Sequence, residues 1–185
     1  AAGFEVEEVT LDGLDPARHP LAFLCNPREP WGRMKTVLEK YRGAGGKVIL
    51  TLEPGSELPD GPMDLSTHIL RGLDRRRPGH VGATLPEHLK RSYGDMRAIL
   101  LEPLAMEVGV GGREFMNARG VPVAVLHDSM AMVGDTDWMR TFLQQEAPNR
   151  AVLVLLVETV LGRNADHYAR SVSLDVQVES LSDDD

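Results

Sequence analysis

The sequence predicts an α/β fold: a three-layer, Rossmann-like (flavodoxin-like) sandwich with a mainly parallel sheet and an antiparallel edge strand near the C-terminus. Two observations support this prediction. Short continuous apolar runs, typical of strands covered on both faces, alternate along the chain with segments typical of amphipathic helices. Strand, helix and strand repeated in this order indicate right-handed βαβ units, in which neighbouring strands are parallel.

The predicted buried strands share one feature, a compact apolar run that ends at a polar residue. They are residues 21–25, 48–52, 98–101, 121–126 and 151–157, preceded by a shorter β-rich segment at residues 4–9. The segment from Val172 to Val178 differs, because its apolar residues alternate strictly with Ser, Asp and Gln. Such alternation is typical of a strand with one wet face, so we expect this segment to be the antiparallel edge strand.

The segments between these runs carry apolar residues at helical spacing. The clearest is marked by Trp31, Met34, Leu38 and Tyr41, and the glycines at 43–46 end it. The other predicted helices are residues 65–73, 85–93, 112–119 and a segment that contains Trp138 and is capped by Asp135 or Thr136. We expect residues 1–179 to form a single α/β domain and residues 180–185 to be an acidic, disordered tail.

Composition narrows the class of protein. The 185 residues are 42% hydrophobic, and 20 Lys and Arg against 28 Asp and Glu give a formal charge of −8, which argues against broad nucleic-acid binding. The single cysteine, Cys25, lies in an apolar run and predicts a buried, inert thiol, with no disulfide or cysteine-based zinc cluster. The longest apolar run, 151–157, is far shorter than the roughly 20 residues that span a bilayer. We expect a soluble protein, with an intracellular location favoured, and no metal or cofactor.

Polar residues follow several of the predicted strands. Glu53, Glu102 and the consecutive residues His127, Asp128 and Ser129 stand at such ends. The carboxyl ends of parallel strands lie along one edge of a sheet, where α/β proteins bind ligands. Convergence of Glu53, Glu102, Asp128 and Ser129 there would supply acid, base and nucleophile for a hydrolase or transferase of esterase-like or phosphatase-like type.

Two other features could bind an anion or a partner. Arginines, which grip phosphates and carboxylates with two hydrogen bonds, crowd the loop from Arg71 to His80. They are Arg71, Arg75, Arg76 and Arg77. Gly111 and Gly112 belong to a glycine-rich turn whose backbone amides could hold an anion. A small-anion or nucleotide sensor is therefore a further hypothesis.

The N-terminal third of the chain carries a recognisable pattern. Residues 21–29 read LAFLCNPRE, residues 41–50 read YRGAGGKVIL, and Glu53-Pro54-Gly55 follows. This pattern resembles the glutamine-amidotransferase-like domains of ABC-transporter auxiliary proteins, gliding proteins and an intraflagellar-transport subunit. In that family a strand ends in Gly-Pro-Arg-Glu, and the next helix ends in Gly-Gly before the following strand. Asn26 stands here in place of the family's glycine. The resemblance implies a non-catalytic interaction domain.

No catalytic signature is complete in this sequence. The glycine-flanked serine of esterases, the paired aspartates of phosphatases, the dinucleotide fingerprint and the P-loop each lack a required residue. The leading hypothesis is therefore a non-catalytic binding or assembly domain that mediates protein–protein interaction. The surfaces we expect to bind the partner are the loop from Arg71 to His80 and the edge strand from Val172 to Val178. The enzyme and the anion sensor are the alternatives.

Overall fold

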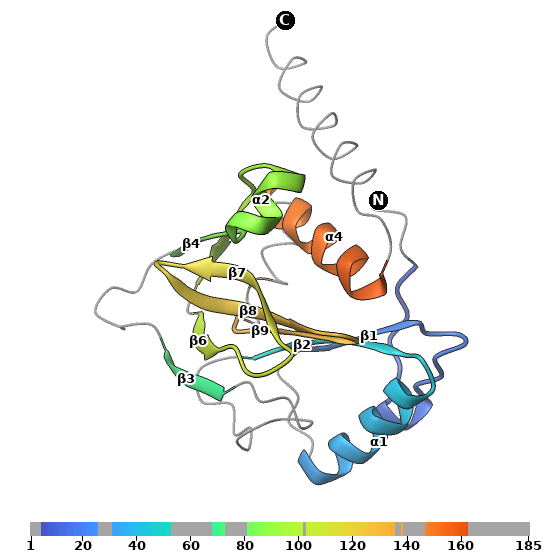
Figure 1. The fold of residues 1–185 in the computed structure, drawn as a ribbon. Coiled ribbons are helices and arrows are strands. Elements are labelled where there is room, and N and C mark those ends of the chain that lie inside the picture. The colour runs from blue at the N-terminus through green and yellow to red at the C-terminus, as the bar shows by residue number, and fades with distance from the viewer. Residues whose placement is uncertain are drawn as a thin grey trace, which may run out of the picture.

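The computed structural model describes residues 5–25, 31–52, 68–72, 81–101, 103–135, 138 and 147–162 (Figure 1). They form a curled seven-stranded sheet with strand order β1-β2-β9-β8-β7-β4-β5, and a separate two-stranded sheet made of β3 and β6. The strands are β1 (Leu21–Cys25), β2 (Lys47–Thr51), β3 (His68–Gly72), β4 (Val81–Thr84), β5 (Arg97–Leu100), β6 (Leu104–Glu107), β7 (Arg113–Ala118), β8 (Val121–His127) and β9 (Met130–Val133). The helices are the short 3-10 turn η1 (Leu11–Gly13), α1 (Trp31–Gly43), α2 (Glu87–Tyr93) and α4 (Ala147–Leu161).

The large sheet is mixed and mostly antiparallel. Only the pairs β1–β2 and β2–β9 are parallel, whereas β9–β8, β8–β7, β7–β4 and β4–β5 are antiparallel. The expected Rossmann-like sandwich with a mainly parallel sheet is therefore wrong. The reason is local: His127 pairs with Met130 across a two-residue turn, and Ala118 pairs with Val121 across another. A parallel connection needs a crossover of about a dozen residues or more, which these turns do not contain.

Several predicted elements were placed correctly and others were not. The strands at 21–25, 48–52, 98–101 and 121–126 and the helices at 31–41 and 85–93 were correct to within a few residues. The apolar run 151–157 lies in helix α4, residues 112–119 lie mainly in strand β7, and 68–72 form strand β3 rather than part of a helix. Residues 5–9 have no regular secondary structure. The predicted strand from Val172 to Val178 and the predicted tail at 180–185 lie outside the described residues.

Helix α4 explains the misassigned apolar run. Residues 152–157 are all buried, so this stretch of the helix is apolar on every side rather than along one stripe. A short apolar run gives no periodicity by which a buried helix can be told from a buried strand. None of the helices in the described residues is long and apolar enough to cross a membrane.

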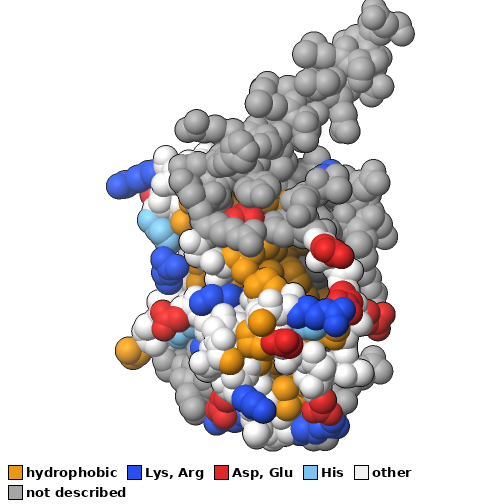
Figure 2. All heavy atoms as spheres, turned by 90° about the vertical axis from the view of Figure 1, so that its right-hand side faces the viewer, with side chains coloured by type: hydrophobic (Ala, Val, Ile, Leu, Met, Phe, Trp, Pro, Cys, Tyr) orange, Lys and Arg blue, Asp and Glu red, His pale blue; other side chains and the backbone are white. Residues whose placement is uncertain are grey.

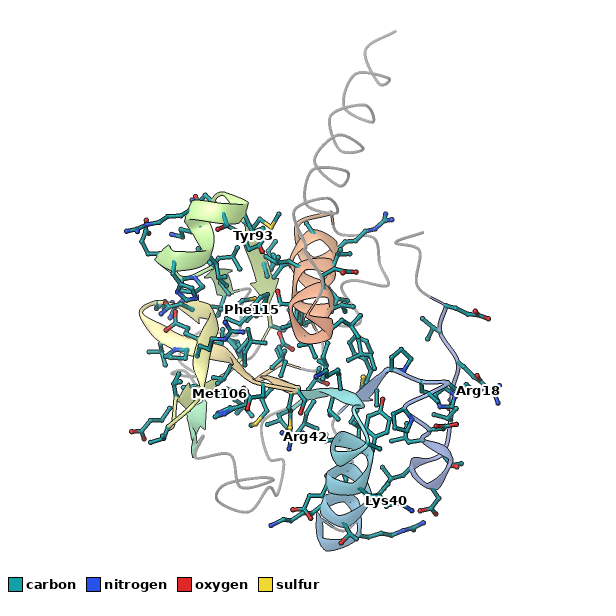
Figure 3. All side chains as sticks on the ribbon, turned by 45° about the vertical axis from the view of Figure 1, so that its right-hand side comes forward. Arg18, Lys40, Arg42, Tyr93, Met106 and Phe115 are labelled. Atoms are coloured by element: carbon teal, nitrogen blue, oxygen red, sulfur yellow. The ribbon has the colours of Figure 1, made fainter. Side chains whose placement is uncertain are left out.

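The core lies on both faces of the large sheet. Alternate residues of β2 divide between the two faces, with Ile49 in the cluster around α4 and Leu50 in the cluster around α1. Phe115 of β7 packs on the α4 side, whereas Met106 of β6 belongs to the α1 side (Figure 3). These two core clusters hold the sheet between α1 and α4 and so fix the positions of its turns and edges.

Candidate functional site

The direction of β8 decides where the predicted catalytic residues lie. The parallel strands β1, β2 and β9 end together at one edge of the sheet, but β8 runs the other way. Ser129 therefore lies beside the start of β2, where Val48 N donates a hydrogen bond to Ser129 O at 2.9 Å. At about 3.3 Å per residue, the four steps from Lys47 to Thr51 separate the two ends of β2 by roughly 13 Å.

This separation concerns the predicted catalytic residues Glu53, Glu102, Asp128 and Ser129. Asp128 and Ser129 are at the edge opposite to the carboxyl end of β2, which leads towards Glu53. Glu53 and Glu102 themselves lie outside the described residues. A joint site of these four residues stays a prediction, and the described part of the chain brings together a different set of polar groups.

That set gathers at the turn between β8 and β9. Arg42, in the last turn of α1, donates from Nε to Oγ of Ser129 at 2.8 Å, and Figure 3 shows Arg42 where α1 approaches the sheet. His127 is 8% exposed, and its ring lies against Gly112 of the turn before β7. A Cβ at Gly112 would lie 2.6 Å from Nε2 of His127, so only glycine leaves room for the ring. We call Arg42, Gly112, His127, Asp128 and Ser129 the hairpin cluster.

The hairpin cluster unites residues that the sequence assigned to two different hypotheses. Asp128 and Ser129 were predicted for catalysis and Gly112 for anion binding, whereas Arg42 was not predicted. No sequence signal points to Arg42, because the fold alone brings position 42 to position 129. Asp128 is exposed and has a positive φ of 25°, which the tight turn requires.

Electrostatics in the hairpin cluster favour an uncharged imidazole. Burial lowers the pKa of His127, the exposed carboxylate of Asp128 raises it, and the guanidinium of Arg42 lowers it further. The neutral form of His127 thus predominates at neutral pH. The Ser129 hydroxyl oxygen accepts a hydrogen bond from a cation. The bond between Arg42 and Ser129 therefore links α1 to the β8–β9 turn, next to the neutral ring of His127.

The predicted anion-binding residues are dispersed or not described. Gly111 is exposed with φ at 79°, and the Gly112 amide donates to Gly109 O within the turn at 3.0 Å. Arg71 lies in β3, at the end that pairs with Leu104 of β6, so its backbone is at the end of β6 away from this turn. Arg75, Arg76 and Arg77 lie outside the described residues, and their role stays a prediction.

Two buried polar side chains that bind backbone groups lie at the β5 end of the sheet. Asn149 of α4 accepts from Ile99 N at 2.6 Å and donates to Ile99 O at 2.9 Å. Asp135 accepts from Leu101 N at 2.8 Å and from Trp138 N at 3.2 Å. The bond to Trp138 is the capping bond expected of Asp135, whereas the two links to the chain around β5 were not predicted. No sequence signal points to the role of Asn149, because the fold alone brings position 149 to position 99.

Cys25 is exposed, so the expectation of a buried thiol was wrong. The run that contains it is β1, which lies at one end of the sheet and is therefore covered less completely than a central strand. Within the described residues, no three His, Cys, Asp or Glu side chains lie close enough together to hold a metal ion.

Comparisons with known proteins show the fold. No protein-family model matches the chain, and no curated protein matches its sequence. Among solved structures, the N-terminal domain of mmIFT52 matches with a TM-score of 0.63 and 15% identity, over 83% of this chain and 81% of that one. Alpha-L-fucosidase isoenzyme 2 from Paenibacillus thiaminolyticus matches with a TM-score of 0.59 and 15% identity, over 83% of this chain and 26% of that one.

These matches support one part of the resemblance seen in the sequence. The fold likeness to the mmIFT52 domain agrees with the resemblance to an intraflagellar-transport subunit. The glutamine-amidotransferase part of that resemblance stays a prediction. The chain spans about a quarter of the fucosidase, so this fold also occurs as one portion of a much longer polypeptide.

Proposed function

We propose that this chain is a non-catalytic domain that binds another protein and contributes to an assembly. The observation that carries the proposal is the fold likeness to the mmIFT52 N-terminal domain, which extends over most of both chains. That domain belongs to a protein of intraflagellar transport. Assembly through protein contacts is the function that we transfer, without a named partner.

The polar residues of the described chain favour the same conclusion. Ser129 is held by Arg42, and Asp135 and Asn149 bind backbone groups of other segments. These side chains connect α1, α4 and three parts of the sheet. Such bonds are typical of residues that fix a fold, and a rigid fold is a suitable platform for a partner.

From the sequence, we propose the basic loop from Arg71 to His80 or the segment from Val172 to Val178 as the partner surface. Four arginines within ten residues of an acidic chain are a sequence feature suited to an acidic partner.

The test begins with affinity capture by the full chain, followed by expression and purification of each captured protein. Direct binding is then measured by calorimetry for the parent chain and for R75E/R76E/R77E. The matched control R91E/R97E/R119E reverses three exposed arginines, which lie in α2, in β5 and in the turn between β7 and β8. We expect saturable binding that the loop variant weakens by about tenfold or more, since each lost charge-assisted contact costs roughly 1.5–3 kcal/mol.

One result would exclude the loop as the partner surface, and another would overturn the proposal. Equal affinity of the parent and the loop variant would remove the basic loop as the partner surface. Turnover of chromogenic esters or phosphoesters that disappears in S129A would favour the hydrolase instead.

A further inference from the structure

The two ends of the large sheet are built differently. At the β5 end, the outward N–H and C=O of Ile99 bond to Asn149, and the N–H of Leu101 bonds to Asp135. Both side chains are buried. At Ile99 and Leu101 they therefore take hydrogen-bonding positions that a further strand would use.

The β1 end carries no comparable closure in the part of the chain that the structure describes. Lys47 N donates to Pro20 O, and this bond sets the register of the β1–β2 ladder. Because successive residues of a strand turn their backbone groups to opposite sides, those of Leu21, Phe23 and Cys25 point away from β2. Among the described strands, only β2 pairs with β1.

The side chains of β1 do not protect this edge. Natural edge strands are usually blunted by lysine, proline, a bulge or an inward charge. The sequence of β1 is LAFLC, which contains none of these residues, and its register with β2 is regular. Phe23 at its centre is 39% exposed, and Cys25 is exposed as well. The β1 edge therefore presents the outward N–H and C=O groups of Leu21, Phe23 and Cys25 beside the exposed apolar side chain of Phe23.

An acidic segment accompanies the edge. The carboxylate of Glu7 accepts two hydrogen bonds from Arg18, at 2.9 and 3.0 Å, just before β1. It also lies 3.5 Å from Nε2 of His19. Its neighbours Glu5 and Glu8 are exposed. Val6 between them is 91% exposed. Figure 2, which faces the right-hand side of Figure 1, shows hydrophobic side chains in the middle of this face with charged groups around them.

We propose that the β1 edge binds an extended segment of a partner protein as an eighth strand of the sheet. The segment has apolar residues at alternate positions, which contact Phe23, and Lys or Arg at its flank, which face Glu5 and Glu8. Backbone bonds to Leu21, Phe23 and Cys25 supply the affinity, as in other cases of strand addition. This inference rests on the proposed protein-binding function and adds a binding surface separate from the loop from Arg71 to His80, for an apolar segment with basic rather than acidic flanks.

The probe is a displayed library of random peptides of about ten residues, long enough to cover one strand and its flanks. Selected peptides are synthesised and measured by fluorescence anisotropy with the full chain. We expect selection of alternating apolar sequences with basic flanks. Amide hydrogen exchange should slow at Leu21, Phe23 and Cys25 when the peptide is bound.

Substitutions locate the binding surface. F23K places a charge on the edge and should weaken peptide binding by about tenfold, the effect of one blocked strand contact. The matched control V110K changes another exposed apolar side chain, which is 92% exposed and lies between β6 and β7, and should alter affinity less than about twofold. F23T retains strand propensity and should give an intermediate loss, which guards against misfolding of F23K.

Two charge-reversal variants test whether Glu5 and Glu8 attract the basic flanks of the peptide. E5K/E8K should lower the affinity for basic peptides by about tenfold and reduce the dependence of that affinity on salt concentration. The control E87K/E107K makes the same change of charge on two exposed glutamates of α2 and β6. We expect this control to bind like the parent chain.

Three outcomes would overturn the inference. The first is that the library yields no peptides with alternating apolar residues and basic flanks. The second is that the parent and F23K bind the peptide with equal affinity while hydrogen exchange at the β1 amides does not slow. The third is that the chain alone forms a concentration-dependent dimer in which the same amides are protected without peptide. A purified partner that binds the parent and F23K equally would remove the edge but leave the proposed function in place. Turnover abolished by S129A would instead remove the proposed function.

Discussion

Asn149 and Ile99 exchange two hydrogen bonds, so one side chain of α4 satisfies the outward backbone groups of an edge strand. Asn149 is fully buried. An amide side chain has the same donor and acceptor as a peptide group, which lets it replace the missing strand. Its position links the long apolar helix to the far end of the sheet.

We predict that N149A lowers the free energy of unfolding by about 2–4 kcal/mol, because two partly buried backbone groups of Ile99 lose their partner. Chemical denaturation followed by circular dichroism measures this loss. The control N117A removes a bond from Gly120 N to Oδ1 at 2.7 Å in an exposed turn, and should cost about 1 kcal/mol or less. Equal losses in the two variants would show that Asn149 does not close the sheet.

Gly134 is predicted to tolerate no side chain. A Cβ there would lie 2.5 Å from Leu104 O, and Leu104 N donates to Gly134 O at 2.6 Å. G134A should lower the unfolding free energy by about 1–3 kcal/mol, the usual cost of overpacking. G82A, where a Cβ meets no atom within 4 Å, is the control and should leave the melting temperature nearly unchanged. Similar melting curves for both variants would contradict the close contact between β6 and the end of β9.

The buried His127 predicts a loss of stability on mild acidification. Burial holds its pKa below the value of about 6.5 of a free histidine, so the unfolded chain takes up a proton first as the pH falls. The contribution of neutral His127 is complete above about pH 6.5 and decreases from there to the folded-state pKa. H127Q cannot be protonated and should flatten the stability profile between about pH 7.5 and pH 5.5. Denaturation midpoints at several pH values measure this slope, and H88Q, an exposed histidine of α2, should retain it.

Two charges with opposite effects on His127 provide a paired prediction. Arg42 lowers the pKa of His127 and Asp128 raises it, so R42Q should raise that pKa and D128N should lower it. Asparagine tolerates the positive φ of position 128, so D128N preserves the turn. Titration of the His127 ring signal by NMR gives both shifts. Shifts of the same sign in both variants would show that the contacts of the hairpin cluster differ from those described.

The local part of the fold was largely predictable, because it depends on short-range patterns. The helix α1 has apolar residues at helical spacing and a glycine-rich end, and β1, β2 and β8 are compact apolar runs. Residues 112–119 were misassigned because β7 pairs with β8 through a tight turn that carries no proline or asparagine–glycine signal. Gly120, with φ of 82°, was the clue to that turn.

The grouping of the polar residues in the hairpin cluster could not be predicted from the sequence. Ser129 was predicted to act together with Glu53, Glu102 and Asp128, and that role stays a prediction. The structure bonds its hydroxyl to Arg42, which lies 87 residues earlier in the chain. Cys25 was expected to be buried since its neighbours are apolar. Its exposure follows from the place of β1 in the strand order, which no local pattern records.

By itself, the sequence determined which segments are apolar, where most of them begin and end, and that the chain carries excess negative charge. Only the tertiary structure decided that β8 runs against β9, that residues 151–157 fill the core as a helix, and that the two edges of the sheet differ. The physical reason is that hydrophobic burial depends on composition and spacing, whereas strand direction and edge closure depend on hydrogen bonds between residues far apart in the chain.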